Sequence, residues 1–175
     1  MHRDYIDFQD RSCPLGFLIT FRCYGTWFHG DSRGSVDRKT FNSYGAPEIS
    51  PTPNWVAKEM SSVEHPPFEL NAKCRQIVEE AIREVATFRK YDLIALSVRT
   101  NHVHVVENAP VKPERAMDAF KAYSTRRLRA NGLVGIGQKV WARHGSTRYL
   151  WTKEHVGLAA EYVERGQGND LPEFD

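Results

Sequence analysis

The stretch that decides the fold is Tyr91–Glu107, which reads YDLIALSVRTNHVHVVE. Two runs rich in aliphatic and β-branched residues, Tyr91–Val98 and His102–Glu107, flank the short polar segment Arg99–Asn101. Two β-forming runs joined by so short a turn pair side by side in opposite directions. The stretch therefore predicts a β-hairpin, and with it an antiparallel sheet.

Helical patterns lie on both sides of this hairpin. Segment 71–89 repeats apolar residues at i, i+3, i+4 and i+7, which is the spacing of one buried helix face. Segment 113–130 begins with proline and ends before Asn-Gly, and segment 152–165 begins with threonine. These are favoured helix boundaries. We therefore expect three amphipathic helices that pack on the sheet.

Two further β-forming stretches complete the expected sheet. Gly16–Tyr24 is β-branched and aromatic, and Val140–Trp151 predicts a strand or an ordered arm. Between them, Gly25–Pro53 is rich in Gly, Ser, Asn and Pro and predicts a long irregular loop after the first strand. The order of these elements predicts an α+β fold, an antiparallel sheet with helices packed on one face.

The composition is that of one globular domain. The chain has 175 residues, of which 41% are hydrophobic and 26% charged, and it has no apolar run long enough to cross a bilayer. Its three cysteines include no CxxC pair, which excludes a disulfide scaffold or a thiolate zinc site and is typical of the cytoplasm. We expect a polar lead-in at 1–14, a single domain at 15–165 and a polar tail at 166–175.

Charge is concentrated in one part of the chain. The net charge is +2, yet segment 119–153 contains no acidic residue and carries eight basic ones, so the remainder carries −6. Such a segment predicts contact with a polyanion, although a solvated helix face would also explain it. The candidate contact residues are Lys121, Arg126, Arg127, Arg129, Arg143 and Arg148.

Two histidines are candidate metal ligands. His102 and His104 are two residues apart on a predicted strand, so both imidazoles lie on one face of the sheet. Two such rings can bind one divalent cation. The alternative is a pair of strand histidines that hydrogen-bond on a hydrated sheet face.

Tyr123 is a candidate nucleophile. On a helical wheel it lies about 100° from the stripe that faces the core, beside arginines that could neutralise a phosphoryl group. A tyrosine hydroxyl can attack phosphorus and form a covalent ester. The alternative is a tyrosine at the edge of the core.

Several of these segments resemble one family. SVRTNHVHVV (Ser97–Val106) resembles the signature hairpin of the IS200-like single-tyrosine (HUH) transposases, in which a turn leads into a His-hydrophobic-His motif. FKAYSTRRLR (Phe120–Arg129) resembles the helix that carries their catalytic tyrosine. The resemblance extends over about residues 15–165, and REP-associated tyrosine transposases share the same domain.

The resemblance implies a ferredoxin-like or RRM-like fold and an activity. That activity is cleavage and rejoining of single-stranded DNA, hairpin-bearing in such relatives, through a 5′-phosphotyrosine with Mg²⁺ or Mn²⁺. By position, His102 and His104 would be metal ligands and Tyr123 the nucleophile. A homodimer is also implied, in which a tyrosine helix can serve the metal site of the partner.

One departure concerns a third metal ligand. The family often has Gln or Asn one turn after the tyrosine, but this chain has Arg127 there, and arginine has no lone pair to donate. His144, His29 and Asp31 are candidates by residue type alone, and Glu107 alternates to the face opposite the histidines.

Two other functions remain open at this point. The same fold could bind folded single-stranded DNA or RNA without cutting it, with aromatic residues near the basic segment stacking on bases. A metal phosphohydrolase acting on small substrates is the other, but it would leave the basic segment unexplained.

Overall fold

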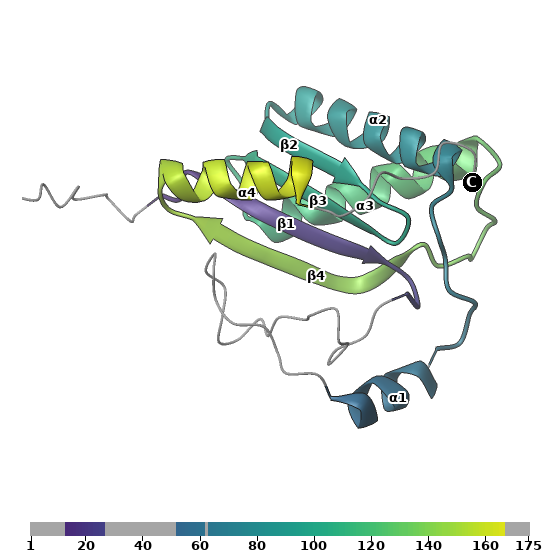
Figure 1. Ribbon diagram of the computed structural model, residues 1–175. Coiled ribbons are helices and arrows are strands. Elements are labelled where there is room, and N and C mark those ends of the chain that lie inside the picture. Colours follow the sequence, from purple (N-terminus) through teal and green to yellow (C-terminus); the bar gives the residue numbers. More distant parts are fainter. Residues whose placement is uncertain (1–12, 27–51, 62, 167–175) are drawn as a thin grey trace, which may run out of the picture.

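The computed structural model describes residues 13–26, 52–61 and 63–166 (Figure 1). Within these ranges the strands are β1 (Gly16–Cys23), β2 (Asp92–Val98), β3 (His102–Asn108) and β4 (Trp141–Leu150). The helices are α1 (Pro53–Ser61), α2 (Ala72–Arg89), α3 (Pro113–Ala130) and α4 (Lys153–Arg165). None of these helices is long and apolar enough to cross a bilayer.

The four strands form one antiparallel sheet in the order β2-β3-β1-β4. The predicted hairpin is confirmed as β2 and β3, and Arg99 N donates to His102 O at 2.8 Å to close its turn. Strand β1 lies between β3 and β4, with Thr20 opposite both His104 and Ser146. The predicted α+β class and antiparallel sheet are therefore confirmed, and β4 is a strand rather than an arm.

The helices begin where the sequence indicates. The side chain of Asn71 accepts a hydrogen bond from Cys74 N at 2.9 Å, and that of Thr152 accepts one from His155 N at 3.0 Å. Pro113 occupies the first turn of α3, where its missing N–H costs nothing. These caps fix the starts of the helices that cover the sheet.

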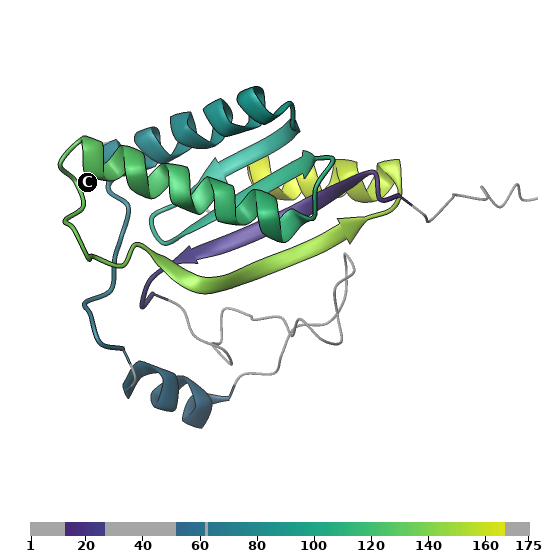
Figure 2. The same ribbon diagram turned by 180° about the vertical axis from the view of Figure 1, so that it is seen from behind.

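Helices cover both faces of the sheet. Helices α2 and α3 lie on one face, behind the sheet in Figure 1 and in front of it in Figure 2. Helix α4 crosses the other face, chiefly over β2 and β3 (Figure 1). The expectation of helices on one face thus holds for α2 and α3, whereas α4 packs on the opposite one.

Side-chain alternation along β1 produces two cores. Phe17, Ile19 and Phe21 point toward α2 and α3 and belong to the larger buried cluster. Leu18 points the other way, into a smaller cluster that Ala159 of α4 joins. The sheet therefore separates the side chains of α3 from those of α4, which pack on its opposite faces.

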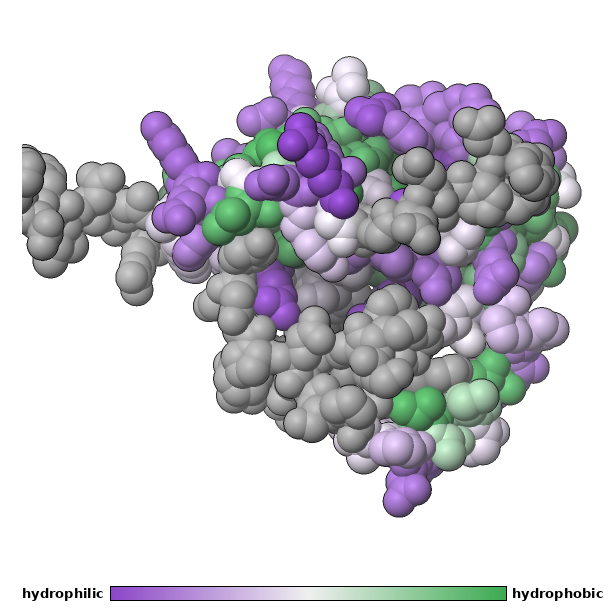
Figure 3. Space-filling model, in the orientation of Figure 1, coloured by the Kyte–Doolittle hydropathy of each residue, from purple (hydrophilic) through white to green (hydrophobic). Residues whose placement is uncertain are grey.

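Helix α1 was not predicted and falls partly within the stretch expected to be irregular. It stands apart from the other described elements in Figures 1 and 2 and makes no inter-element contact with them. Trp55 and Met60 are exposed on it, and Figure 3 shows hydrophobic residues over this helix. The rest of the expected loop, residues 27–51, lies outside the described residues.

Candidate active site

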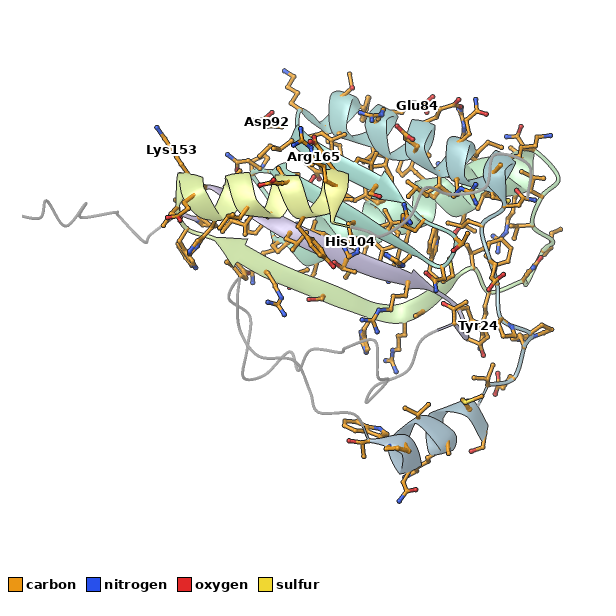
Figure 4. The ribbon with its side chains drawn as sticks, viewed as in Figure 1. Tyr24, Glu84, Asp92, His104, Lys153 and Arg165 are labelled. Atoms are coloured by element: carbon orange, nitrogen blue, oxygen red, sulfur yellow. The ribbon has the colours of Figure 1, made fainter. Side chains whose placement is uncertain are left out.

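The two histidines of β3 lie on the sheet face that α4 crosses. Their ring centroids are 4.7 Å apart with an interplanar angle of 76°. His104 is buried, His102 is half-buried, and Figure 4 shows His104 at the sheet surface beside α4. The structure therefore brings the predicted pair together on one face.

Each histidine has an oxygen atom at its Nδ1. Thr20 Oγ1 lies 2.7 Å from Nδ1 of His104, and Asn101 Oδ1 lies 2.6 Å from Nδ1 of His102. A metal ion bound by both rings would therefore be coordinated through the Nε2 atoms. The donor chemistry of the pair fits a divalent cation that accepts imidazole ligands.

Tyr162 of α4 lies beside the histidine pair. Its ring centroid is 5.6 Å from that of His104 at an interplanar angle of 73°, and the residue is 44% exposed. Tyr162 was not among the candidates predicted from the sequence, because α4 was expected on the same face as the other helices. One feature of the sequence could have pointed to Tyr162: it directly precedes Val163, a residue of α4 that faces the sheet.

The structure does not bring Tyr123 to the histidines of the same chain. Tyr123 packs against the larger core cluster on the α2 and α3 side of the sheet, and the guanidinium of Arg126 lies 4.9 Å from its ring centroid. The helical wheel was right about α3, whose buried residues include Met117, Phe120 and Leu128. Strand β3 presents the histidines away from α3, so Tyr123 could reach such a pair only in a second copy of the chain.

No third protein ligand is evident among the described residues, which contain no group of three His, Cys, Asp or Glu side chains placed to bind one ion. Arg127 forms an ion pair with Glu84 at 3.3 Å on the other side of the sheet. By alternation from Gly145, His144 lies on the histidine face of β4, two strands from β3. His29 and Asp31 lie outside the described residues.

Glu107 takes no part in this site. As expected it lies on the face opposite the histidines, fully buried, and neither carboxylate oxygen has a hydrogen-bond partner among the described residues. Burial raises the pKa of this carboxyl from 4.5 to about 7.

The predicted polyanion contacts divide into two groups. Lys121 is buried and its Nζ donates to the carbonyls of Ala142 and His144 at 3.0 and 3.1 Å, so this lysine ties α3 to β4. Its assignment as a DNA contact is corrected on this ground. Arg126 and Arg129 are exposed and line a hollow of about 510 Å³ between α3 and β4, with Trp141 at its wall.

The remaining basic residues lie on β4. Arg143 is exposed, and Arg148 pairs with Leu18 in the register of β1, which places it on the same sheet face as the histidines. A second hollow, of about 660 Å³, lies beside Tyr123 and the exposed Phe88, with Arg83 and Arg89 at its rim.

A comparison with known families identifies the family of this chain. Residues 66–164, more than half of the chain, match the family model described as "Transposase IS200 like". The chain belongs to the IS200-like transposase family. The matched range contains the histidine pair, Tyr123 and Tyr162, whereas β1 with Thr20 lies before it.

Two solved structures resemble this transposase-family chain. One is the REP-associated tyrosine transposase bound to a REP hairpin, with 13% identity, a TM-score of 0.46, and coverage of 93% of this chain and 68% of that one. The other is a candidate transposase from Deinococcus radiodurans R1, with 15% identity, a TM-score of 0.43, and coverage of 97% and 98%. A search of curated proteins gives no match.

Proposed function

We propose that this member of the transposase family cleaves and rejoins single-stranded DNA, with Tyr162 as nucleophile and with His102 and His104 binding Mg²⁺ or Mn²⁺. The observation that carries the proposal is the position of the Tyr162 ring beside His104, on the face that holds both imidazoles. Tyr162 takes the place that the sequence resemblance assigned to Tyr123.

The reaction is a transesterification. The hydroxyl oxygen of Tyr162 attacks the phosphorus of a phosphodiester, a Tyr162 Oη–P bond forms, and the bond from phosphorus to the 3′ oxygen breaks. The tyrosine loses its proton and the departing 3′ oxygen gains one. The products are a 5′-phosphotyrosine and a free 3′ hydroxyl, and the attack of a 3′ hydroxyl on the phosphotyrosine reverses the step and rejoins a strand.

The histidines serve this step through the metal that they would hold. When bound, a divalent cation neutralises charge on the phosphoryl oxygens in the transition state. His104 and His102 would supply two nitrogen ligands, and the Tyr162 ring lies 5.6 Å from that of His104, on the face where a phosphate would bind. Further ligands would come from the substrate or from water.

The DNA contacts follow from the exposed cations. Four arginines of the acid-free segment 119–153 lie at the surface or on the histidine face. They are Arg126, Arg129, Arg143 and Arg148. Phosphate contacts of this kind are sequence-independent and weaken with salt. We propose hairpin-bearing single strands as substrate, in the cytoplasm, and a homodimer as the assembly.

A non-cleaving function has one observation in its favour. The described residues provide only two imidazole ligands, and Gly166, one turn after Tyr162, has no side chain to offer a third. A module that binds hairpin single-stranded DNA or RNA on the same fold is therefore the second candidate.

A covalent trapping experiment separates the two functions. Purified protein is incubated with Mn²⁺ and end-labelled single strands that carry hairpins, and the mixture is run on a denaturing protein gel. Label that travels with the wild type and with Tyr123→Phe, but not with Tyr162→Phe, supports the proposal. A native-gel shift without any covalent label supports the binding module instead.

A further inference from the structure

Both histidines of the candidate site are engaged at the same ring nitrogen. The 2.7 Å contact of Thr20 Oγ1 and the 2.6 Å contact of Asn101 Oδ1 both fall on Nδ1, on His104 and His102 respectively. The two oxygens come from different elements, β1 and the β2–β3 turn. Two separate contacts on equivalent ring atoms indicate that Thr20 and Asn101 have the same role.

The fold places these oxygens through backbone pairing. Thr20 is directly opposite His104 in the β1–β3 register, and its neighbours Ile19 and Phe21 point into the other core. Asn101 is anchored at the end of the turn because Cys23 N donates to its carbonyl oxygen at 2.8 Å. A register slip of one residue would replace the Thr20 hydroxyl with an apolar side chain.

The contact at His102 selects one tautomer of its ring, and the contact at His104 is compatible with the same tautomer. A neutral imidazole has one N–H donor and one lone-pair nitrogen, and an amide oxygen only accepts hydrogen bonds. His102 Nδ1 must therefore donate to Asn101 Oδ1, which leaves the lone pair on Nε2. The Thr20 hydroxyl oxygen can accept in the same way from His104 Nδ1.

We propose that Thr20 and Asn101 are positioning residues that hold both histidines in the Nδ1–H tautomer, so that both present a lone pair on Nε2 to a divalent cation. This inference rests on the proposed function, because it concerns the metal site of the same reaction. Partners of this kind fix the orientation of a ligating ring, and their loss typically costs about 10- to 100-fold in metal affinity.

Nuclear magnetic resonance of ¹⁵N-labelled histidine tests the tautomers without any metal. At pH 8, above the ordinary imidazole pKa of about 6.5, long-range ¹H–¹⁵N spectra of the wild type should show Nδ1–H on His102 and His104. Thr20→Val should release His104 alone, and Asn101→Ala should release His102 alone. Nε2–H rings in the wild type, or tautomers that neither variant changes, would overturn the proposal.

Calorimetric titration with Mn²⁺ alone gives the second readout. Thr20→Val and Asn101→Ala should each weaken binding by about 10- to 100-fold, while Thr20→Ser and Asn101→Asp, which keep an acceptor oxygen, should retain most of the affinity. Equal affinity for Thr20→Val and the wild type would contradict the inference, as would an equal loss in Thr20→Ser, which would point to a merely structural role.

The outcomes distinguish this inference from the proposed function. If no covalent DNA adduct forms but the tautomers and the Mn²⁺ affinities change as stated, the proposed reaction fails and the positioning role stands. If the adduct forms on Tyr162 and the tautomers do not respond, the reaction stands and the positioning role fails.

Discussion

At the scale of single residues, the histidine pair is the feature on which the proposed chemistry depends. His102 and His104 are two of the few groups with metal-binding chemistry that the described structure brings within reach of one another. Among the described residues, no third His, Cys, Asp or Glu side chain is placed to bind the same ion, so no neighbour could take over the role of either histidine. Substitutions at these two positions should therefore have large effects on metal binding.

We expect His102→Ala to abolish strand cleavage and to lower Mn²⁺ affinity by at least ten-fold, because a single imidazole holds a labile divalent ion poorly. His102 is half-buried rather than core, so the thermal midpoint should move little. Calorimetric titration and thermal unfolding measure the two effects. His155→Ala, a histidine of α4 outside the pair, serves as the matched control and should bind Mn²⁺ like the wild type.

Glu107 makes stability depend on pH. Burial raises its folded pKa from 4.5 to about 7, so its contribution to stability is greatest below about pH 4.5 and is lost as pH rises toward 7. Above that pH the buried charge costs about 3 kcal/mol. Glu107→Gln should remove this dependence and make the protein more stable than the wild type at pH 8.

The measurement is thermal unfolding of both proteins between pH 5 and pH 8. The difference between the variant and the wild type should grow as pH rises, and Glu164→Gln, an exposed glutamate, should show no such trend. A Glu107→Gln variant that is less stable than the wild type at pH 8 would show that the buried carboxyl has a partner.

At the scale of elements, the packing of β4 leaves no room for a side chain at Gly145. A Cβ there would clash with Thr20 O on β1 and with the sulfur of Met117 on α3. Gly145→Ala should therefore destabilise the protein by about 1 to 3 kcal/mol, as overpacking does. Denaturant unfolding measures the loss.

Gly157 in α4 is the matched control, since nothing lies within 4 Å of a Cβ added there. Gly157→Ala should stabilise the protein by about 0.5 to 1 kcal/mol, because alanine is the better helix former. If both glycine variants shift stability in the same direction, the packing of β4 against β1 and α3 is not as described.

Local elements could be predicted from the sequence, whereas their packing could not. Apolar periodicity and the caps at Asn71 and Thr152 are local signals, and the helices begin where these signals indicate. Which face of the sheet each helix covers depends on contacts distant in sequence. For that reason Tyr123, flanked by arginines, was a reasonable candidate, and Tyr162 emerges only once α4 is seen on the histidine face. Helix α1 was not predicted because prolines stand before and after it and many of the residues around it are polar.

At the scale of the whole molecule, charge should govern binding to DNA. The acid-free segment 119–153 carries exposed Arg126 and Arg129 on α3. If each neutralises one phosphate, the double variant Arg126→Gln/Arg129→Gln should reduce the slope of log affinity against log salt by about 1 to 2 for single-stranded DNA.

Fluorescence anisotropy with a labelled hairpin-bearing strand, repeated over a range of salt concentrations, gives this slope. Arg83→Gln is the matched control, because Arg83 is already paired with Glu79 at 2.7 Å. A slope that is the same for the double variant and the wild type would remove these arginines from the DNA contact.

The central claim is that Tyr162, and not Tyr123, forms the covalent bond to DNA. The most direct test is peptide mapping by mass spectrometry of the adduct formed with Mn²⁺ and a hairpin-bearing single strand. We expect a nucleotide phosphate on the peptide that contains Tyr162 and an unmodified peptide for Tyr123. A modified Tyr123 with an unmodified Tyr162 would contradict it, and would place the α3 tyrosine at the histidines of a second copy of the chain.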